Sequence, residues 1–360
     1  MLQASGSLHD PILIIGGAGE VGRWATRFLR EQHSDVPILI GGRDEQRAIR
    51  ATATIDGASA VVVDLTASDL GLGERRVSAV ATLFTDETGA ALRWAQRVGV
   101  GHVNISPSIS ELGLETATFM QKPAAAPVVL GTEWLVGATS VPSLLFAQEF
   151  GLLENIHIEA VLDEQDAFGP AANADLERQM YAGAAALMRR AGAWRWCRGD
   201  ETRSTVRAID GTELDANVFS PNDVLLLGNA TGAPEVRFDL AIGMSSSRRN
   251  GGPVSTEIII NLSGLDHAGQ PLRKRHAIVH PGGQMPLTGL GVALVLERLA
   301  GLAGDTPRPG LYFPAQLIDH ATYFKRLRAS GGEVIELKPI QHALQGSDQA
   351  LIGAENEPHS

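Results

Sequence analysis

The stretch that decides the fold is PILIIGGAGEVGRWATRFLR, residues 11–30, in which a short apolar run leads through glycines into a helical pattern. Its G-x-G-x-x-G spacing permits a tight turn, lets the backbone approach a pyrophosphate and lets the helix pack closely. The helix start also offers free N–H groups to phosphates. The alternative is a glycine turn that binds nothing. We expect a dinucleotide here, contacted by Gly17, Ala18, Gly19, Glu20, Val21 and Gly22.

The pattern of this stretch is repeated along the first third of the chain. Between Pro11 and about Leu130, helical segments alternate with the short apolar runs PILII, VPILI, AVVVD, VSAVATLF, HVNIS and APVVL. Apolar runs without polar alternation are typical of strands that are buried on both faces, and their alternation with helices indicates a parallel sheet. The sequence therefore predicts the α/β class, with a doubly wound Rossmann domain over residues 1–135.

The end of the second apolar run indicates which dinucleotide binds. NAD enzymes usually carry an acid there, which bonds the ribose hydroxyl, whereas an arginine accommodates the 2′-phosphate of NADP. Gly41 and Gly42 occupy the positions of the acid, and Arg43 follows them. Asp44 is better explained as the N-cap of the next helix. We therefore predict NADP(H), the alternative being that Arg43 is a solvated surface residue.

Ligands of open α/β sheets bind beyond the carboxyl ends of the strands, so the residues that follow two further apolar runs are candidates for cofactor contacts. Asp64 and Leu65 end the run AVVVDL, where we expect them to face the adenine. Phe84 and Thr85 follow the fourth run, where we expect them to face the middle of the cofactor.

The middle of the chain has a different sequence pattern. Extended segments rich in β-branched residues are separated by Gly, Asn and Asp, which is typical of a mostly antiparallel sheet. A long helical stretch is expected from about Ala172 to Arg190, and an apolar helix from Pro286 to Leu302 should pack on the nucleotide domain. We predict an α+β substrate and dimerisation domain at 136–285, a segment returning to the Rossmann domain at 286–345, and a polar tail at 346–360.

The composition of the chain limits the classes of partner and site that we expect. The 360 residues carry a net charge of −11, which disfavours nucleic acid and anionic membranes as main partners. We find no apolar run of membrane-spanning length and no signal-peptide pattern at the start, so we expect a cytoplasmic protein. The single cysteine, Cys197, excludes an internal disulfide framework and a multi-thiolate metal site. His276 and His280 have no nearby acid or cysteine to complete a metal set, so we expect no metal.

Several catalytic motifs are absent. None of the three tyrosines, Tyr181, Tyr312 and Tyr323, is followed four residues later by lysine, which excludes the Tyr-x-x-x-Lys pair of short-chain dehydrogenases. The chain has no G-x-S-x-G elbow and no P-loop lysine. These absences narrow the range of chemistry that the chain can carry out.

At this point the sequence resembles the saccharopine dehydrogenase-like reductases, a family that includes saccharopine reductase and carboxynorspermidine dehydrogenase. The resemblance rests on residues 11–145, through ILIIGGAGEVGRWATRFL, LIGGRD, VVVDLT and VVLGTEWLVGATSVPSLLFA. It continues over 285–336, through MPLTGLGVALVLERLAGL and RPGLYFPAQLIDHATYFKRLRASGGEV. The Pro-Glu of the family's closing segment is Pro314-Ala315 here, so any role of that glutamate is absent.

The resemblance implies NADPH-linked reduction in a cleft between the two domains, commonly of an imine formed from an amine and an oxo acid. Some members of the family instead reduce a C=C bond in a lipid-like substrate, and reduction of a C=O bond is a further alternative. A rival of another class is a non-catalytic NADP-sensing protein, because function does not follow from fold. We also expect a small-molecule substrate and a homodimer.

Substrate and proton-transfer residues are less strongly indicated. An arginine could hold a substrate carboxylate, for which Arg178 and Arg248 are candidates, and Trp134 could form a wall of the nicotinamide pocket. The alternative for each arginine is a solvated surface residue, and the alternative for Trp134 is packing alone. His280 ends the last strand before the returning helix, so we predict that it lies near the cleft and supplies a proton. The alternative is that His280 merely begins a turn.

Overall fold

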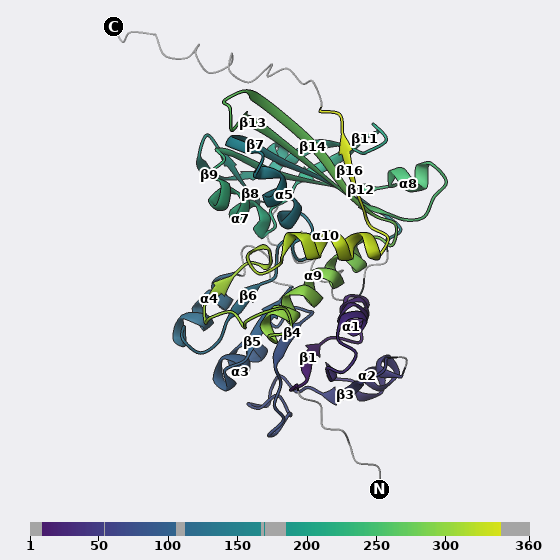
Figure 1. Cartoon of the computed structure of the whole chain (residues 1–360), viewed down its shortest axis with the longest axis vertical. Coiled ribbons are helices and arrows are strands. Elements are labelled where there is room, and N and C mark those ends of the chain that lie inside the picture. The colour runs from purple at the N-terminus through teal and green to yellow at the C-terminus, as the bar shows by residue number, and fades with distance from the viewer. Residues whose placement is uncertain (1–8, 54, 106–111, 167–168, 170–184, 340–360) are drawn as a thin grey trace.

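The structure is a computed structural model that describes residues 9–53, 55–105, 112–166, 169 and 185–339. Within these ranges the chain forms two sheets, which we name A and B, and Figure 1 shows sheet B above sheet A with helices between and around them. None of the helices in this part of the chain combines the length and the apolar character that a membrane span requires.

Sheet A is parallel throughout. Its strands are β1 (Ile12–Ile15), β2 (Ile38–Gly42), β3 (Ala58–Val62), β4 (Ala79–Thr82), β5 (Gly101–Asn104), β6 (Val128–Leu130) and β15 (Leu311–Tyr312). They lie in the order β15-β6-β5-β4-β1-β2-β3, so the order reverses between β1 and β4. That reversal is the switch point at which doubly wound sheets bind dinucleotides. The predicted fold class is confirmed, and the edge strand β15 is an addition from the C-terminal segment.

Helices cover both faces of sheet A. They are α1 (Glu20–Gln32), α2 (Glu45–Thr52), α3 (Ala90–Val98) and α4 (Leu112–Gln121). Successive residues of a strand point to opposite faces. Accordingly, Ile14 belongs to the apolar cluster that contains Phe28 of α1, whereas Leu13 belongs to the cluster that contains Trp94 of α3. This burial on both faces explains why the strands read as continuous apolar runs.

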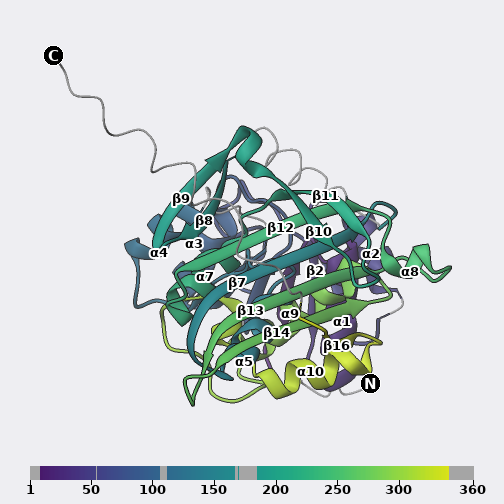
Figure 2. The same cartoon turned by 90° about the horizontal axis from the view of Figure 1, so that it is seen from above.

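Sheet B is mixed. Its strands are β7 (Phe150–Asp163), β8 (Ala185–Arg190), β9 (Ala193–Arg198), β10 (Arg203–Arg207), β11 (Glu213–Val218), β12 (Glu235–Gly243), β13 (Thr256–Asp266), β14 (Pro271–His280) and β16 (Glu333–Leu337). Its main path is β10-β11-β12-β7-β13-β14-β16, and β8 joins β12 to β9. The β12–β7 pair is parallel and the other pairs of the sheet are antiparallel, so the predicted mostly antiparallel sheet is confirmed. Figure 2 shows its long strands side by side from above.

The face of sheet B that is turned toward sheet A is covered by helices. The remaining helical elements are α5 (Ser140–Ala147), η1 (Gly199–Thr202), α7 (Asn222–Thr231), α8 (Ser246–Arg249), α9 (Gln284–Leu299), η2 (Pro314–Gln316) and α10 (His320–Ala329). Ile158 of β7 and Ile260 of β13 share one apolar core with Val141 of α5 and Leu227 of α7. Helix α10 contacts both α9 and α5, so this core continues toward sheet A.

The long helix predicted from Ala172 to Arg190 is wrong at its C-terminal end. Residues 185–190 form strand β8, which pairs antiparallel with β9, and residues 170–184 lie outside the described residues. Ala191 and Gly192 both have positive φ, 48° and 76°, as a two-residue hairpin turn with the right twist requires. The helix propensity of AALMRR is therefore overridden by strand pairing across this turn.

Helix α9 connects the two sheets. Almost every residue of it is buried, and it lies against α1. At Gly289 an added Cβ would stand 2.4 Å from Trp24, and at Gly291 it would stand 2.1 Å from the carbonyl oxygen of Val136. These close approaches require glycine. The approach at Gly289 places α9 beside α1, and the approach at Gly291 places it beside the segment that follows β6.

Candidate functional site

The glycine turn follows β1 and precedes α1, as predicted. The roles of its individual glycines differ from those expected. The left-handed residue is Gly16, with φ +83°, rather than Gly17. At Gly17 an added Cβ would stand 2.8 Å from the carbonyl oxygen of Ile14, and at Gly22 it would stand 2.3 Å from that of Gly17. Gly17 and Gly22 are therefore glycines because strand, turn and helix are packed closely, and Gly16 makes the turn.

The first turn of α1 is suited to an anion. Its N-cap is Gly19, whose extended backbone offers no capping side chain, so the first N–H groups of the helix are not bonded by a cap. At Gly19 an added Cβ would approach only the Gly16 carbonyl oxygen, at 3.3 Å. Ala18, Glu20 and Val21 complete the turn, and the Glu20 carboxylate is paired with Arg23 on the exposed surface. These residues fit a dinucleotide pyrophosphate.

The end of β2 leaves room beside an exposed cation. A Cβ added at Gly42 would meet nothing within 4 Å, whereas one at Gly41 would stand 2.9 Å from Val63. Arg43 is exposed and follows Gly42 directly. The Asp44 carboxylate accepts a hydrogen bond from the backbone N–H of Arg47 at 2.9 Å. Asp44 is thus the N-cap of α2, as predicted, and is committed to that helix.

The other predicted cofactor residues also lie at strand ends of sheet A. Phe84 follows β4, and an added Cβ at Gly16 would stand 3.1 Å from its ring, so β4 and the glycine turn meet at the switch point. Thr85 comes next along the chain. Asp64 and Leu65 follow β3, where the Asp64 carboxylate accepts hydrogen bonds from the N–H and hydroxyl of Thr66. These bonds lower the pKa of Asp64.

Trp134, the predicted wall of the substrate pocket, follows β6 and is half-buried. Its ring stands edge-to-face against Phe238 of β12, with centroids 5.4 Å apart, so it connects the two sheets. The next residues, Leu135 and Val136, both have positive φ, 52° and 56°. That conformation is strained for a β-branched residue, and such strain gathers at functional sites.

A buried carboxyl pair beside Trp134 was missed by the sequence reasoning. Asp223, at the start of α7, accepts hydrogen bonds from the backbone N–H of Trp134 at 2.6 Å and from the hydroxyl of Thr139. Glu133 accepts one from the backbone N–H of Ala315 at 3.3 Å. Burial raises the pKa of Asp223 to about 6. Burial, and then the charge of Asp223, hold the pKa of Glu133 well above its usual value.

The remaining predicted residues do not gather at the strand ends of sheet A. His280 ends β14 and is only 2% exposed, and its Nδ1 accepts a hydrogen bond from the N–H of Gly282 at 3.0 Å. Burial lowers the pKa of His280, against an opposing contribution from the Ser330 backbone.

Arg248 lies in α8 and forms an ion pair with Asp163 at 2.6 Å. Figures 1 and 2 both place α8 at the opposite side of the molecule from α3 and α4. Arg178 lies outside the described residues.

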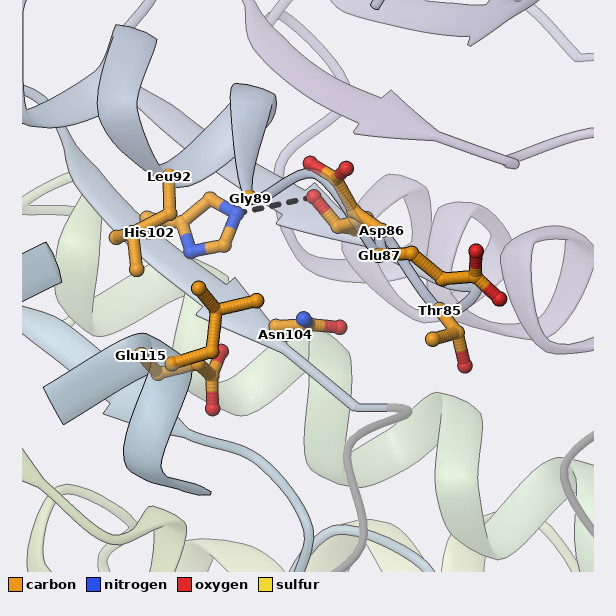
Figure 3. Close-up of a pocket in the computed structure, with 10 residues that line it drawn as sticks. Thr85, Asp86, Glu87, Gly89, Leu92, His102, Asn104 and Glu115 are labelled. Atoms are coloured by element: carbon orange, nitrogen blue, oxygen red, sulfur yellow. Dashed lines mark hydrogen bonds between the residues drawn. The ribbon is translucent and has the colours of Figure 1, made fainter. Parts of the chain in front are cut away.

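A cavity of about 380 Å³ lies between α3 and α4, beside the ends of β4 and β5 (Figure 3). The sequence reasoning missed it, apart from Thr85, because its polar residues come from β4, the loop that follows it, β5 and α4. The side chains that line it include Thr85, Asp86, Glu87, His102, Asn104 and Glu115. No group of three or more His, Cys, Asp or Glu side chains suited to a metal ion occurs among the residues that the structure describes.

Comparisons with known proteins establish the fold. No protein-family model and no curated protein sequence matches the chain. The apo form of saccharopine dehydrogenase (L-Glu forming) from Saccharomyces cerevisiae matches with a TM-score of 0.62 at 12% identity, over 91% of this chain and 100% of that one. A myo-inositol dehydrogenase from Corynebacterium glutamicum gives 0.45 at 12% identity, over 92% and 100% of the two chains.

The chain therefore has a fold similar to that of saccharopine dehydrogenase. This agrees with the resemblance seen in the sequence. At 12% identity, the similarity between the two proteins concerns the fold alone, because the same fold can carry different activities.

Proposed function

We propose that this protein is an NADPH-dependent oxidoreductase of the saccharopine dehydrogenase type, which reduces an imine formed from an amine and an oxo acid. The observation that carries the proposal is the pairing of an uncapped helix start at Gly19 with the open strand end at Gly42 and Arg43. The first takes the pyrophosphate and the second takes the 2′-phosphate of the adenosine ribose.

The preference for NADP follows from charge and space. Arg43 presents a planar cation that can pair with a phosphate and stack on adenine. The open space at Gly42 accommodates the phosphate, and the neighbouring carboxylate of Asp44 is held on the N–H of Arg47. An NAD enzyme would instead place a carboxylate at the end of β2 to bond the ribose hydroxyl.

The dinucleotide, when bound, supplies the hydride that reduces the substrate. We propose that residues 1–135 form the cofactor domain, that 136–285 form the substrate and dimerisation domain, and that 286–345 return to the first. In this arrangement Phe84 and Thr85 line the path of the cofactor, and Trp134 walls the substrate pocket. His280, which is 2% exposed at the end of β14, is the proposed proton donor.

The substrate class is proposed from the resemblance in sequence together with the fold. The similar structure from S. cerevisiae is described as a saccharopine dehydrogenase of the L-Glu-forming type. The resemblance in sequence implies reduction of an imine formed from an amine and an oxo acid. We accordingly propose an amine and an oxo acid as the two substrates here.

The test combines binding and turnover. NADPH and NADH are titrated into the purified protein, and NADPH oxidation is then followed with amines and oxo acids, supplied separately and as mixtures. Oxidation that requires both an amine and an oxo acid supports imine reduction. Oxidation by an oxo acid alone indicates reduction of C=O instead. Tight NADPH binding without turnover in any mixture favours the non-catalytic NADP-sensing alternative.

A further inference from the structure

We propose that the open edge of strand β9 binds an extended acidic peptide, which adds to sheet B as a further strand. The peptide alternates carboxylate and apolar side chains. The inference goes beyond the proposed reductase activity, because the surface does not include the cofactor path. It rests on the backbone, the aromatic side chains and the charge of residues 185–198, which we name the β8–β9 hairpin.

The outer edge of β9 has backbone groups without a strand partner. Among the residues that the structure describes, β9 pairs with β8 alone, and Figures 1 and 2 place it at the rim of sheet B. Arg190 and Ala193 flank the two-residue turn, so they form the first hydrogen-bonded pair of the hairpin. Such pairs alternate with non-hydrogen-bonded ones along an antiparallel ladder. The N–H and C=O groups of Trp194 and Trp196 therefore point away from β8, toward the open edge.

The side chains of the same two residues are exposed. Trp194 is 37% exposed and Trp196 is 50% exposed, whereas the other three tryptophans of the chain, all of which the structure describes, are buried or half-buried. Both indoles lie on one face of the hairpin, because side chains alternate along a strand. Tryptophan is enriched among the residues that dominate binding at protein interfaces. The pair therefore marks this face as a contact surface for another chain.

Trp194 is held in place by its own chain. An added Cβ at Gly228 of α7 would stand 2.6 Å from its ring, so the indole lies directly against the helix backbone. The guanidinium of Arg189 lies 5.4 Å from the centroid of the same ring and donates a hydrogen bond to the Gly228 carbonyl oxygen. An aromatic side chain that is already ordered loses little conformational entropy on binding.

The charge of the hairpin selects an acidic partner. The hairpin carries four arginines and no Asp, Glu or Lys, in a chain whose net charge is −11. Arg190, Arg195 and Arg198 are exposed, and their guanidinium groups form no ion pair with any residue that the structure describes. Glu201, which follows the hairpin, accepts a hydrogen bond from the backbone N–H of Arg198. Carboxylates of a partner would supply the complementary charge.

The alternation of side chains along β9 defines the sequence pattern of the partner. Arg195 lies between Trp194 and Trp196 in the chain and points to the opposite face, which it shares with Arg190. A strand added beside β9 alternates in the same way. It would place apolar side chains against the two indoles and a carboxylate between them, beside Arg195. The expected motif is apolar–acidic–apolar, which reads the same in either strand direction.

A peptide fits this edge better than other anionic partners do. The phosphates of a nucleic acid or of a membrane surface could pair with the arginines. Neither of them presents N–H and C=O groups at strand spacing to the open backbone of β9, as a peptide does. The net charge of −11 also opposes the approach of a large polyanion. A second copy of β9 would bring two sets of unpaired arginines together.

The test uses the capped hexapeptide Glu-Val-Glu-Val-Glu-Val and a counterpart in which lysine replaces glutamate. Each is titrated into the full-length protein by calorimetry, and we expect the basic peptide to bind at least tenfold more weakly. Arg195→Glu should weaken binding of the acidic peptide at least tenfold. Arg75→Glu, the same change at an exposed arginine between β3 and β4, should alter it by less than twofold. Absence of binding, or equal dissociation constants for Arg195→Glu and the wild type, would overturn the proposal.

A second measurement detects the added strand itself. Hydrogen exchange is followed by NMR at the backbone amides of Trp194 and Trp196. Both amides should exchange rapidly in the free protein, and at least tenfold more slowly at a saturating concentration of the acidic peptide. If the peptide binds without protecting either amide, the arginine side chains alone hold it and the proposed strand is wrong.

The competing occupants give separate outcomes. Single-stranded oligo(dT) and vesicles of phosphatidylcholine and phosphatidylserine are titrated in the same way, and sedimentation of the protein alone reports a second copy. If one of these partners binds and Trp196→Ser abolishes its binding, while the hexapeptide does not bind, the edge belongs to that partner and the proposal is wrong. If nothing binds, the arginines only prevent association between strand edges, which also overturns it. None of these readouts depends on NADPH, so the outcome is independent of the proposed reductase.

Discussion

Asp223 accepts a hydrogen bond from the backbone N–H of Trp134 at 2.6 Å, across 89 residues of sequence. This bond joins the start of α7, which packs on sheet B, to the segment that follows β6 of sheet A. The second oxygen of Asp223 accepts from the hydroxyl of Thr139. A single buried carboxyl group thus holds together three segments at the junction of the two sheets.

The raised pKa of Asp223 makes the junction sensitive to pH. Its folded-state pKa is about 6, above the unfolded value of 3.8, so the folded protein binds more protons between these values. The contribution of Asp223 to stability must therefore fall as pH rises through this window. We expect Asp223→Asn to gain about 1 kcal/mol relative to the wild type between pH 5 and pH 7. Urea unfolding at both pH values measures this, and a pH-independent difference would contradict it.

Arg43 should determine the choice of cofactor. We expect NADPH to bind at least tenfold more tightly than NADH, a difference of about 1.4 kcal/mol. Arg43→Ala should remove most of that preference, because it removes the cation beside the open space at Gly42. Arg50→Ala, an exposed arginine in the last turn of α2, is the matched control and should retain it. Dissociation constants from fluorescence titration decide between these outcomes.

Gly42→Asp should reverse the preference. An added Cβ at Gly42 meets nothing within 4 Å, so the side chain fits without disturbing the fold. Its carboxylate would repel the 2′-phosphate and could accept hydrogen bonds from the ribose of NADH. We expect NADPH affinity to fall at least tenfold with the melting temperature nearly unchanged. Gly41→Asp serves as a contrast, since its Cβ would stand 2.9 Å from Val63 and should destabilise the protein.

Much of sheet A could be predicted because its signals are local. The strand, the glycine turn and the helix are contiguous from Ile12 to Gln32, and each βα unit repeats that pattern. Even within this motif the sequence did not show that Gly16 makes the left-handed turn, because glycines stand at both 16 and 17. The choice depends on how closely the turn packs on β1.

The remaining features depend on contacts between distant residues. Ala185–Arg190 is composed of good helix formers, and its pairing with β9 and β12 makes it a strand. The environment of Asp223 comes from Trp134 and Thr139, more than 80 residues away. His102 similarly acquires its partner Thr82 from a neighbouring strand. Such pairs produce no local pattern in the sequence, so they could not be predicted from it.

Alanine substitutions at two glycines of the turn should affect different properties, stability at one and NADPH affinity at the other. At Gly22 an added Cβ would stand 2.3 Å from the backbone of Gly17, so Gly22→Ala should destabilise the protein by about 1–3 kcal/mol. At Gly19 the added Cβ meets only the Gly16 carbonyl oxygen at 3.3 Å. Gly19→Ala should therefore fold, and lose NADPH affinity because the methyl group occupies the path of the pyrophosphate. Thermal unfolding and cofactor titration on both variants test this, and equal NADPH affinity in Gly19→Ala would contradict it.

The burial of His280 determines the pH dependence of kcat that a catalytic role for this residue would produce. Burial lowers its pKa, so the ring is mostly neutral at pH 7 and becomes a proton donor only as pH falls. If it donates the proton, kcat should rise as pH decreases toward that lowered pKa, and general acid catalysis is worth roughly 100-fold or more. We expect His280→Asn to lower kcat by about that factor, to abolish the rise at low pH and to leave NADPH affinity unchanged. A variant whose kcat and pH profile match those of the wild type would show that His280 only shapes the β14–α9 turn through its bond to Gly282.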